Sequence, residues 1–448
     1  MYHPQNRIST RSMNRRDFLW LASVSTLGLV SGCAVNPVTG ERQFMLMSES
    51  GEISLDQKHS PHQFSADYGE VQDSNLNSYL DRKGKDLAAI THRPDMPYSF
   101  RCVNATNVNA YAFPGGSIAT TRGILLEMEN EAELDALLGH EIAHVNARHT
   151  AARMSRAIMA QALLAGASLY LESQQEDYAA VAAGLGAVAT GALLASYSRA
   201  NEREADELGM QYMTDAGMNP QGMVGLMDVL QGVNSRKPSA IERMFSTHPM
   251  SQERYDTARY RAENEYAHAR EFPVHRERYM DNTADLRRMR GAIEDMQEGE
   301  EHMGRQRFHE AEDSFSRALS QAPEDYAALV LMSKCQLALN RPQRARNFSD
   351  RAVRVYPQEA QAHHISGVAA MDLGRYDAAL EGFRRYEDML PGNPNTIFLK
   401  AVCLEGMGRK SDSAGEYERF LQSSGAGEKA DYARKRLQEW GYMDSSDE

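Results

Sequence analysis

A spacing of 34 residues in the C-terminal part of the chain constrains the fold more than any other feature. From about residue 292, two series of residues keep this spacing, and prolines close three successive units: Ala311, Ala345, Ala379 and Ser413; Ala318, Ala352, Tyr386 and Phe420; Pro323, Pro357 and Pro391. Stacked helical hairpins typically have a small residue on one helix, a second residue where this helix meets the neighbouring helix, and a proline between units. Each hairpin buries its apolar face only against the next one. We therefore expect an α-solenoid.

The register of this spacing divides the C-terminal part into units of the tetratricopeptide type. The expected units are 292–325, 326–359, 360–393 and 394–427, followed by a capping helix to residue 442 and an acidic tail over 443–448. An irregular helical domain is the alternative, which the shared register argues against. Cys335 and Cys403 lie 68 residues apart, which is two periods, so we expect them to be too far apart for a disulfide.

The first 32 residues indicate an export signal. Arg15 and Arg16 precede a mostly apolar stretch over 18–32 and then Cys33, and this stretch is too short for a comfortable membrane span. The letters RRDFL resemble a twin-arginine signal, and VSGC resembles a bacterial lipobox. A lipobox would make Cys33 the lipidated first residue of a tether over 33–50. The alternatives are a cleaved secretory peptide without lipid and export by the general secretory route.

Charge and cysteine content exclude two classes of protein. The export signal contains four arginines and one aspartate, so its removal lowers the net charge from −13 to −16, which disfavours a nucleic-acid partner. Besides Cys33, only Cys102, Cys335 and Cys403 are present. An odd number of cysteines does not indicate a disulfide framework, so we expect these three to be buried as small apolar residues.

Residues 51–265 are expected to form a mostly helical α+β domain with a small sheet. Short runs with β-branched and aromatic residues, bounded by glycine or proline, predict strands near 98–104, 109–114 and 117–123. Asn130, followed three residues later by Glu133, predicts the start of a helix. Two segments between 157 and 197 are rich in alanine and glycine, and we interpret them as a close-packed helical pair, with a transmembrane hairpin as the alternative. The charged stretch 266–291 indicates a solvated helical connector.

The segment LLGHEIAHVNARH, at 137–149, has the pattern of a hydrolytic zinc site. On a helix, His140 and His144 share one face, so both imidazoles can bind one ion, with Glu141 beside them. Zinc in a catalytic site takes three protein ligands and keeps a position for water, which becomes acidic near neutral pH. Glu141 would accept that proton and pass it to the leaving amine. The pattern also arises by accident, so the prediction depends on a third ligand.

The segment SRANEREADELG, at 198–209, offers this third ligand. Its composition favours a helix, on which Glu202 and Asp206 share a face. Glu202 can bind zinc, and Asp206 can accept the second ring N–H of a zinc-bound histidine and so fix its tautomer. His149 lies one residue short of the place where metzincins carry a third histidine, so that pattern is absent. A closed structural zinc site is disfavoured because glutamate is an unusual ligand there.

Four segments, in order, resemble one known family. They are NVNAYAFPGGSIATTRGIL, LLGHEIAHVNARH, SRANEREAD and FSTHP, which together resemble the membrane-associated zinc metallopeptidases of the CAAX prenyl protease, HtpX and mitochondrial Oma type. This resemblance implies a gluzincin-type domain. The segment NPVTGERQFML, at 36–46, resembles the opening of secreted members. With its export signal and repeats, the whole chain is similar to periplasmic members of Gram-negative bacteria.

The resemblance implies a role for each matching residue. It makes His140, His144 and Glu202 the ligands of one zinc ion, Glu141 the general base and Asp206 the acid of the family's ExxxD motif. His248 matches a histidine that can occupy the open zinc position and hold the enzyme inactive; by itself it would be a turn residue before a proline. Asn109 and Ala110 match a strand that binds the substrate backbone, with an ordinary sheet edge as the alternative. Arg254 is expected to anchor the loop that carries His248.

We therefore expect a lipid-tethered zinc metalloendopeptidase in the periplasm, held by default at the outer membrane. The resemblance implies a role in protein quality control. Its clients would be unfolded or stalled outer-membrane β-barrel proteins or their assembly machinery, which the repeats would recruit. The rival interpretation is a chaperone or scaffold lipoprotein with a silenced peptidase core. Cleavage of a flexible substrate such as casein by the wild type and by Glu141→Gln distinguishes the two.

Overall fold

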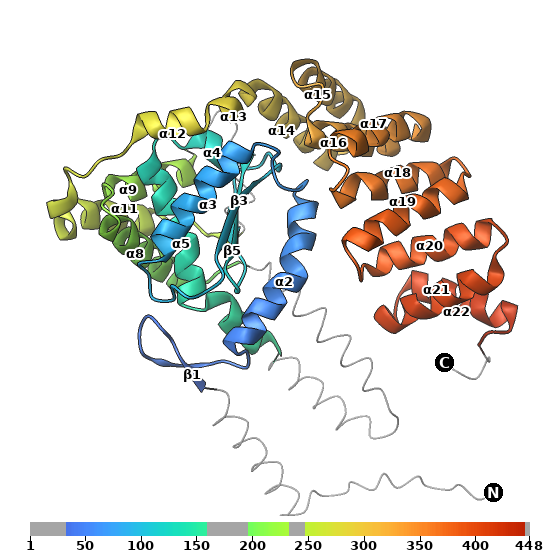
Figure 1. Cartoon of the computed structure of the whole chain (residues 1–448), viewed down its shortest axis with the longest axis horizontal. Helices are drawn as coiled ribbons and strands as arrows, with labels where there is room; N and C mark the ends of the chain where they lie inside the picture. Colours follow the sequence, from blue (N-terminus) through green and yellow to red (C-terminus); the bar gives the residue numbers. More distant parts are fainter. Residues whose placement is uncertain (1–32, 159–195, 233–246, 444–448) are drawn as a thin grey trace, which may run out of the picture.

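The computed structural model of the chain describes residues 33–158, 196–232 and 247–443. The predicted export signal, most of the predicted helical pair at 157–197 and the acidic tail after residue 443 lie outside these ranges. None of the helices within them combines the length and the apolar composition that crossing a membrane requires. Figure 1 shows two parts in chain order, which we name the N-terminal domain (33–289) and the repeat domain (290–443).

A three-stranded sheet lies at the centre of the N-terminal domain, where the sequence predicts strands. The order is β3-β5-β4, in which β3 runs parallel to β5 and β4 runs antiparallel to β5. The strand β4 therefore forms one edge of the sheet. A separate two-stranded hairpin precedes it in the chain. The strands are β1 (Cys33–Val35), β2 (Arg42–Phe44), β3 (Ser99–Val103), β4 (Ala110–Ala112) and β5 (Ser117–Thr121).

Helices cover both faces of this sheet. On one face, the ring of Phe64 lies 6.4 Å from that of Tyr111 and 6.0 Å from that of Phe113. On the other face, Gly84 allows its helix to lie against the ring of Phe100. Because side chains alternate along a strand, the two alanines of β4, which flank Tyr111, face α5. The covering helices are α2 (Glu49–Ala66) on the first face, and α3 (Ser74–Ala88) and α5 (Glu131–Asn146) on the second.

The helix α5 is the core of the N-terminal domain, since all of its residues are buried. It crosses α8 with almost no space between the two backbones: a Cβ atom on Gly209 would lie 2.9 Å from the backbone nitrogen of His140. The remaining helical elements of this domain are α4 (Arg122–Glu127), α8 (Arg199–Asp215), α9 (Gln221–Gln231), α11 (Gln252–Tyr260), η2 (Arg261–Glu265), η3 (Ala267–Ala269), α12 (Arg276–Asn282) and α13 (Ala284–Arg288).

The connector between the two domains is helical, and a few of its residues pack against the N-terminal domain. Tyr279 is fully buried, and its hydroxyl donates to the carbonyl oxygen of Leu125 at 2.6 Å. The carbonyl oxygen of Val274 accepts a hydrogen bond from the backbone nitrogen of Glu131 at 3.0 Å, at the start of α5. Arg278 forms an ion pair with the buried carboxylate of Glu131. The charged side chains of the connector nevertheless lie mostly at the surface, and the side chain of Arg278 is itself 50% exposed.

The repeat domain consists of helical hairpins with the predicted boundaries, so the α-solenoid is confirmed. The small residues of the first 34-residue series are buried between helices. Cys335 and Cys403 are buried and free, as is Cys102. The hairpins are α14 (Arg290–Gly304) with α15 (Phe308–Gln321), α16 (Tyr326–Ala338) with α17 (Pro342–Val355), α18 (Ala360–Asp372) with α19 (Tyr376–Met389) and α20 (Pro394–Gly406) with α21 (Lys410–Ser423), followed by α22 (Glu428–Trp440).

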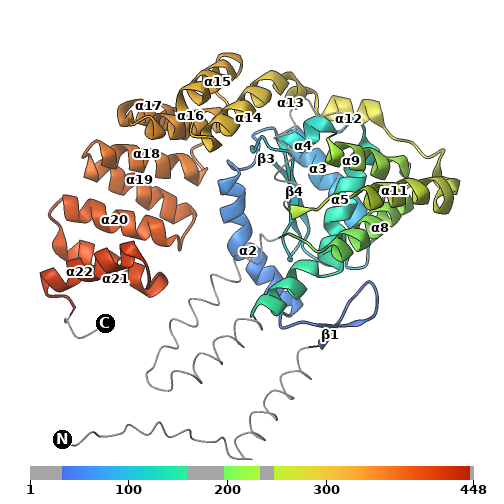
Figure 2. The same ribbon diagram turned by 180° about the vertical axis from the view of Figure 1, so that it is seen from behind.

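The repeat domain curves around one side of the N-terminal domain. Figures 1 and 2 both show α2 between the sheet and α18. Polar contacts join the two domains: the Tyr68 hydroxyl donates to Glu300 at 3.1 Å, and the hydroxyl of Ser65, next to the end of α2, donates to Glu359. Buried groups of this kind need matched partners. The domains are therefore docked in one defined arrangement.

Candidate metal centre

The first two candidate residues lie on α5, whose start is fixed as the sequence predicts. The Asn130 side chain accepts a hydrogen bond from the backbone nitrogen of Glu133 at 3.0 Å. The Glu133 carboxylate in turn accepts from the backbone nitrogen of Glu129 at 2.7 Å and from the Asn130 amide at 2.7 Å. This reciprocal cap satisfies amide groups that the first turn leaves open. His140 and His144 follow on one face, one turn apart.

The next candidates come from α8 and from the segment before α11. The helix α8 begins after Ser198, whose hydroxyl accepts from the backbone nitrogen of Asn201 at 3.2 Å. Glu202 lies in its first turn and Asp206 lies one turn later, and both are buried. His248 is 1% exposed and lies just before α11. Polar side chains from three segments that are far apart in the sequence thus lie together in one buried site.

Four of these side chains converge on a common point. One ligand atom from each of His140, His144, Glu202 and His248 lies within 4.8 Å of the others. The His140 Nε2 atom lies 3.1 Å from His144 Nε2 and 3.3 Å from His248 Nδ1. The Glu202 Oε1 atom lies 3.1 Å from His248 Nδ1 and 3.5 Å from His144 Nε2. The arrangement is a compact group of three imidazole nitrogens and one carboxylate oxygen.

The spacing of these atoms fits a tetrahedral metal ion. Zinc binds imidazole nitrogen and carboxylate oxygen at about 2.0–2.2 Å, which places ligands of a tetrahedron about 3.3–3.5 Å from one another. Four of the six separations run from 3.1 to 3.5 Å, whereas the closest contact between His140 Nε2 and Glu202 is 3.7 Å, to Oε2, and all six are within 4.8 Å. Both the donor types and their spacing therefore suit zinc, and no other described group of three or more ligand-type side chains meets the same criterion.

Glu141 lies beside this group with an unmatched carboxylate. It is fully buried, and within the described part of the chain neither carboxylate oxygen has a hydrogen-bond partner. Its Oε1 atom lies 3.7 Å from His248 Nε2. Burial raises the pKa of Glu141 above its ordinary value, although His248 and His140 act in the other direction. A buried carboxylate without partners costs folding free energy, which is typical of a group kept for chemistry.

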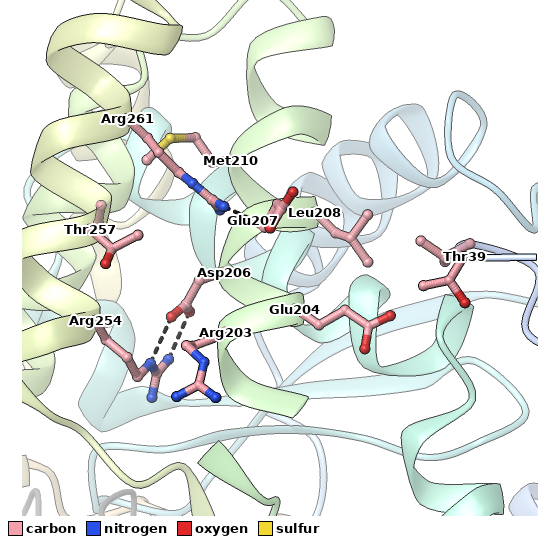
Figure 3. A pocket seen from close by; sticks show the side chains of 12 residues that line it. Thr39, Arg203, Glu204, Asp206, Glu207, Leu208, Met210, Arg254, Thr257 and Arg261 are labelled. Atoms are coloured by element: carbon pink, nitrogen blue, oxygen red, sulfur yellow. Dashed lines mark hydrogen bonds and ion pairs between the residues drawn. The ribbon is translucent and has the colours of Figure 1, made fainter. Parts of the chain in front are cut away.

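Asp206 and Arg254 support the group from behind. The Asp206 Oδ1 atom lies 3.0 Å from His140 Nδ1, the ring nitrogen that does not face the other ligands. Figure 3 shows Arg254 bonded to Asp206 through two nitrogens: Nε donates to Oδ2 at 2.6 Å and Nη2 donates to Oδ1 at 2.7 Å. Arg254 Nη1 also lies 2.8 Å from Glu202 Oε2 and donates to the carbonyl oxygen of Pro249 at 2.9 Å. Burial alone would raise the pKa of Asp206, but the bonds from Arg254 and His140 lower it.

Two aromatic neighbours of His144 were missed by the sequence reasoning. The ring of Tyr197 stacks on that of His144 with 3.7 Å between centroids, and its hydroxyl lies 2.8 Å from Thr150 Oγ1. The Nδ1 atom of His149 lies 2.9 Å from His144 Nδ1. The available signals were the position of Tyr197 directly before the helix cap Ser198 and the nearness of His149 in the chain. His149 lies outside the group of four ligand residues.

Glu204 extends this side of the site toward the N-terminal segment. Its Oε2 atom lies 3.1 Å from His149 Nε2, and the hydrogen bond from His149 lowers its pKa, with a smaller contribution from Asn36. Figure 3 shows Glu204 pointing from α8 toward Thr39, across a cavity of about 360 Å³. Arg203, Arg254 and other charged residues of α8 and α11 line this cavity. The cavity lies behind Asp206, so it is separate from the place where the four ligand atoms meet.

Asn109 and Ala110, the two residues that we expected to bind a substrate backbone, differ in the direction of their main-chain groups at the edge strand β4. The backbone nitrogen of Asn109 donates to Thr121 Oγ1 at 3.1 Å, and its carbonyl oxygen accepts from the backbone nitrogen of Thr121 at 3.0 Å. Because strand hydrogen bonds alternate, Ala110 and Ala112 direct their main-chain groups away from β5. The main chain of Asn109 is therefore occupied, whereas that of Ala110 points away from β5 but belongs to a buried residue, and Ala112 is partly exposed. A narrow gap beside His144 is lined by Ala112 and the residues that follow it.

Comparisons with known proteins agree with this geometry. The model described as Peptidase family M48 matches residues 74–262, and a tetratricopeptide repeat model matches residues 302–366. The metalloprotease YcaL of Escherichia coli is 31% identical over 195 residues, which cover 42% of this chain and 72% of YcaL. The β-barrel assembly-enhancing protease of Yersinia pestis is 28% identical over 246 residues, which cover 54% of this chain and 50% of that protein.

Among solved structures, a crystal structure of the MamA protein aligns with a TM-score of 0.33 and 16% identity, covering 35% of this chain and 86% of that one. The chain spans only half the length of the Yersinia relative, but it spans most of YcaL. The peptidase model includes all four residues of the metal centre, as well as Glu141 and Asp206. The chain therefore belongs to peptidase family M48.

Proposed function

We propose that this protein is a zinc metalloendopeptidase that binds one zinc ion through His140, His144 and Glu202. The observation that carries this proposal is the convergence of these three ligand atoms with His248, at separations that fit a tetrahedron. When bound, zinc supplies the Lewis acidity that polarises a peptide carbonyl and makes water reactive near neutral pH. The membership of family M48 supports the same assignment.

The residues around the ligands carry the proton transfers. Glu141 accepts a proton from the attacking water and donates it to the leaving amine, a task for which a raised pKa is suited. Asp206 Oδ1 lies 3.0 Å from His140 Nδ1, where a proton on Nδ1 would face a carboxylate and His140 Nε2 would stay free to bind the metal. Arg254 in turn keeps Asp206 ionised, because both ends of its guanidinium bond that carboxylate.

We further propose that His248 holds the enzyme inactive. Its Nδ1 atom is at hydrogen-bond distance from both Glu202 and His140, so His248 would serve as the fourth ligand of a metal ion held by the other three residues. A neutral imidazole in that position excludes the water that Glu141 would activate. Release of His248 is then the activating step. The fold is compatible with this regulation, because His248 lies on a segment separate from α5 and α8.

Substrate binding is assigned to the free edge of the sheet. We propose that a substrate adds as a strand to β4, with Ala110 and Ala112 supplying the main-chain donors and acceptors. Asn109 is not part of this role, because Thr121 occupies its main-chain groups. The small side chains of the two alanines face α5, so they leave the substrate close to the helix that carries Glu141.

We place the protein in the periplasm, tethered through a lipid on Cys33 and held by default at the outer membrane. Its proposed task is quality control of outer-membrane β-barrel proteins or their assembly machinery, recruited by the repeat domain. This rests on the sequence of the export signal and on the name of the Yersinia relative, a β-barrel assembly-enhancing protease. The rival assignment is a chaperone or scaffold lipoprotein with a silenced core.

Proteolysis of casein tests the catalytic proposal. Because His248 is proposed to restrain the wild type, the comparison uses four proteins: wild type, Glu141→Gln, His248→Ala and the double variant. Loss of a general base should slow cleavage by about 10²–10⁴-fold, so Glu141→Gln should be inactive while it still binds one zinc ion. Equal cleavage by H248A and H248A/E141Q would remove Glu141 from the mechanism.

The same four proteins test the regulatory proposal. His248→Ala should cleave casein faster than the wild type, because the fourth position is then open. Zinc content should stay at one ion per chain in all four proteins, since three ligands remain. If H248A is as slow as the wild type or slower, His248 has a catalytic or structural role. If none of the four proteins cleaves casein but all bind zinc, the scaffold assignment is favoured.

A further inference from the structure

The second ring nitrogen of His144 leads into a chain of side chains with no role in the function proposed above. His144 Nδ1 lies 2.9 Å from His149 Nδ1, and His149 Nε2 lies 3.1 Å from Glu204 Oε2. Both histidines are buried, and the side chain of Glu204 is partly exposed. The chain runs from a proposed zinc ligand on α5, through the residues after α5, to α8.

This contact depends on a break in the helix. Residues five apart on a continuous α-helix point about 140° away from each other, so His144 and His149 would not meet. Instead α5 ends at Asn146, and Arg148 has a φ of 57°, in the left-handed region that non-glycine residues seldom adopt. The turn is held by the Arg148 side chain, which donates to Glu52 at 2.9 Å and to the carbonyl oxygen of Met47 at 2.8 Å.

The directions of the hydrogen bonds follow from the site. His144 Nε2 faces the other ligand atoms, so its lone pair must be free for the metal and the ring proton must lie on Nδ1. His144 Nδ1–H then donates to His149 Nδ1, which leaves the proton of His149 on Nε2. His149 Nε2–H donates to Glu204. One set of proton positions therefore satisfies both rings, and its acceptor is a carboxylate.

We propose that His149 and Glu204 are positioning residues that fix the ring and the tautomer of His144 and so strengthen zinc binding. The proposal rests on the zinc site proposed above. On the other ligand, His140, the corresponding place is taken by Asp206 at 3.0 Å. The two zinc-binding histidines are therefore held by different means, one directly by a carboxylate and the other through a second imidazole. Loss of such outer partners typically weakens metal binding about 10- to 100-fold.

Zinc affinity, measured on the full chain by competition with a chromophoric chelator, tests this proposal. The variants are His149→Leu, His149→Asn, Glu204→Ala and the control Glu207→Ala. Glu207 also lies on α8 and lines the same cavity, but it pairs with Arg261 at 2.6 Å. The visible spectrum of the cobalt-substituted proteins reports the coordination geometry, and thermal melting of the metal-free proteins reports folding.

We expect H149L and E204A to bind zinc about 10- to 100-fold more weakly than the wild type and to shift the cobalt spectrum. H149N should recover most of the affinity, because its side-chain oxygen lies near the position of the lost Nδ1 and accepts the same hydrogen bond. E207A should match the wild type. Since the side chain of Glu204 is 29% exposed, E204A should fold even if H149L does not.

Two results would overturn the proposal. Wild-type affinity and spectrum in E204A, together with unchanged affinity in H149L or H149N, would show that His144 needs no such support. If H149L and H149N lost zinc affinity equally, and their metal-free forms melted at the same temperature, the imidazole would act by packing alone. Failure of the wild type itself to bind one zinc ion is a different outcome, because it removes the proposed function along with this inference.

Discussion

At the scale of single residues, Arg254 is the cation that permits two carboxylates to be buried side by side. It bonds Asp206 through two nitrogens and lies 2.8 Å from Glu202. All three side chains are buried. Without a cation, two buried carboxylates would repel each other and would tend to take up protons. Arg254 therefore acts on both the stability of the domain and the readiness of Glu202 to bind a metal.

We predict that Arg254→Leu destabilises the protein by about 3–5 kcal/mol, because it leaves buried carboxylates without their counter-ion. It should also weaken zinc binding, since Asp206 then holds His140 less firmly. Thermal melting of the metal-free form and chelator competition measure the two effects. The control is Arg259→Leu, on the same helix α11, whose ion pair with Asp256 is exposed at 3.9 Å. Such a pair contributes only about 0–1 kcal/mol.

The penalty of Arg254→Leu should depend on pH in one direction. Asp206 has a pKa below its ordinary value of 3.8 in the folded protein, so its ionised form stabilises the fold above that value. This stabilisation is lost as the pH falls through the lowered pKa. The difference in melting temperature between the wild type and R254L should therefore narrow in acid. A difference that is constant or grows toward acid pH would contradict the assignment of Arg254 to Asp206.

The residues of the site differ in how far the sequence foretold them. His140, His144 and Glu202 lie on regular helices, where spacing alone predicts a shared face, and the structure brings them together. The contact between His149 and His144 was not predictable in the same way. It depends on the left-handed conformation of Arg148, and this position carries no glycine or asparagine, which would have indicated such a conformation. Asn109 was assigned a backbone role that its bonds to Thr121 forbid.

At the scale of elements, the crossing of α5 and α8 sets the distance between the histidines and Glu202. The two helices meet at Gly139 and Gly209, where a Cβ atom on Gly139 would lie 3.0 Å from the carbonyl oxygen of Gly209. Helices with side chains at the contact are normally 8–10 Å apart, and a glycine pair permits a closer approach. The reach of Glu202 therefore depends on a residue two turns further along α8.

We predict that Gly209→Ala forces α8 away from α5 and moves Glu202 out of reach of the histidines. Overpacking of this kind costs about 1–3 kcal/mol, which outweighs the gain of up to ~1 kcal/mol in helix propensity. Zinc affinity should fall and the metal-free form should melt earlier. The control is Gly415→Ala on α21, where no atom lies within 4 Å of the added Cβ and the propensity gain alone should raise stability. Unchanged zinc affinity in G209A would mean that Glu202 adapts to the shift.

The elements themselves were predictable where one rule governed them. The 34-residue period gave hairpin boundaries that match α14 to α22, because each hairpin contacts only its neighbours and its pattern is local. The strands and the start of α5 followed from local composition and capping. The helical character of the connector followed from its composition, but the burial of Tyr279 against Leu125 did not, because no local pattern encodes a contact between distant segments.

At the scale of the whole molecule, the two domains are joined by charge as well as by shape. The Arg122 Nη1 atom donates to Asp325 Oδ2 at 2.5 Å, and both side chains are buried. The Oδ1 atom of Asp325 caps α16 by accepting from the backbone nitrogen of Ala328 at 2.8 Å. One carboxylate thus starts a helix of the repeat domain and also pairs with the helix that follows β5. If the repeats recruit clients, this contact fixes where they are delivered.

We predict that Asp325→Asn loosens the docking of the domains but leaves the metal centre intact. The asparagine oxygen can still cap α16, whereas the buried guanidinium of Arg122 loses its counter-ion, a change that costs about 3–5 kcal/mol. Hydrogen exchange should rise in α2 and α16, and zinc affinity should equal that of the wild type. Asp295→Asn is the control, since its partner Arg317 is 48% exposed at the surface of the repeat domain. If D325N and D295N had the same melting temperature, the charge of Arg122 would need no partner. The repeat domain would then be docked on the N-terminal domain by shape alone.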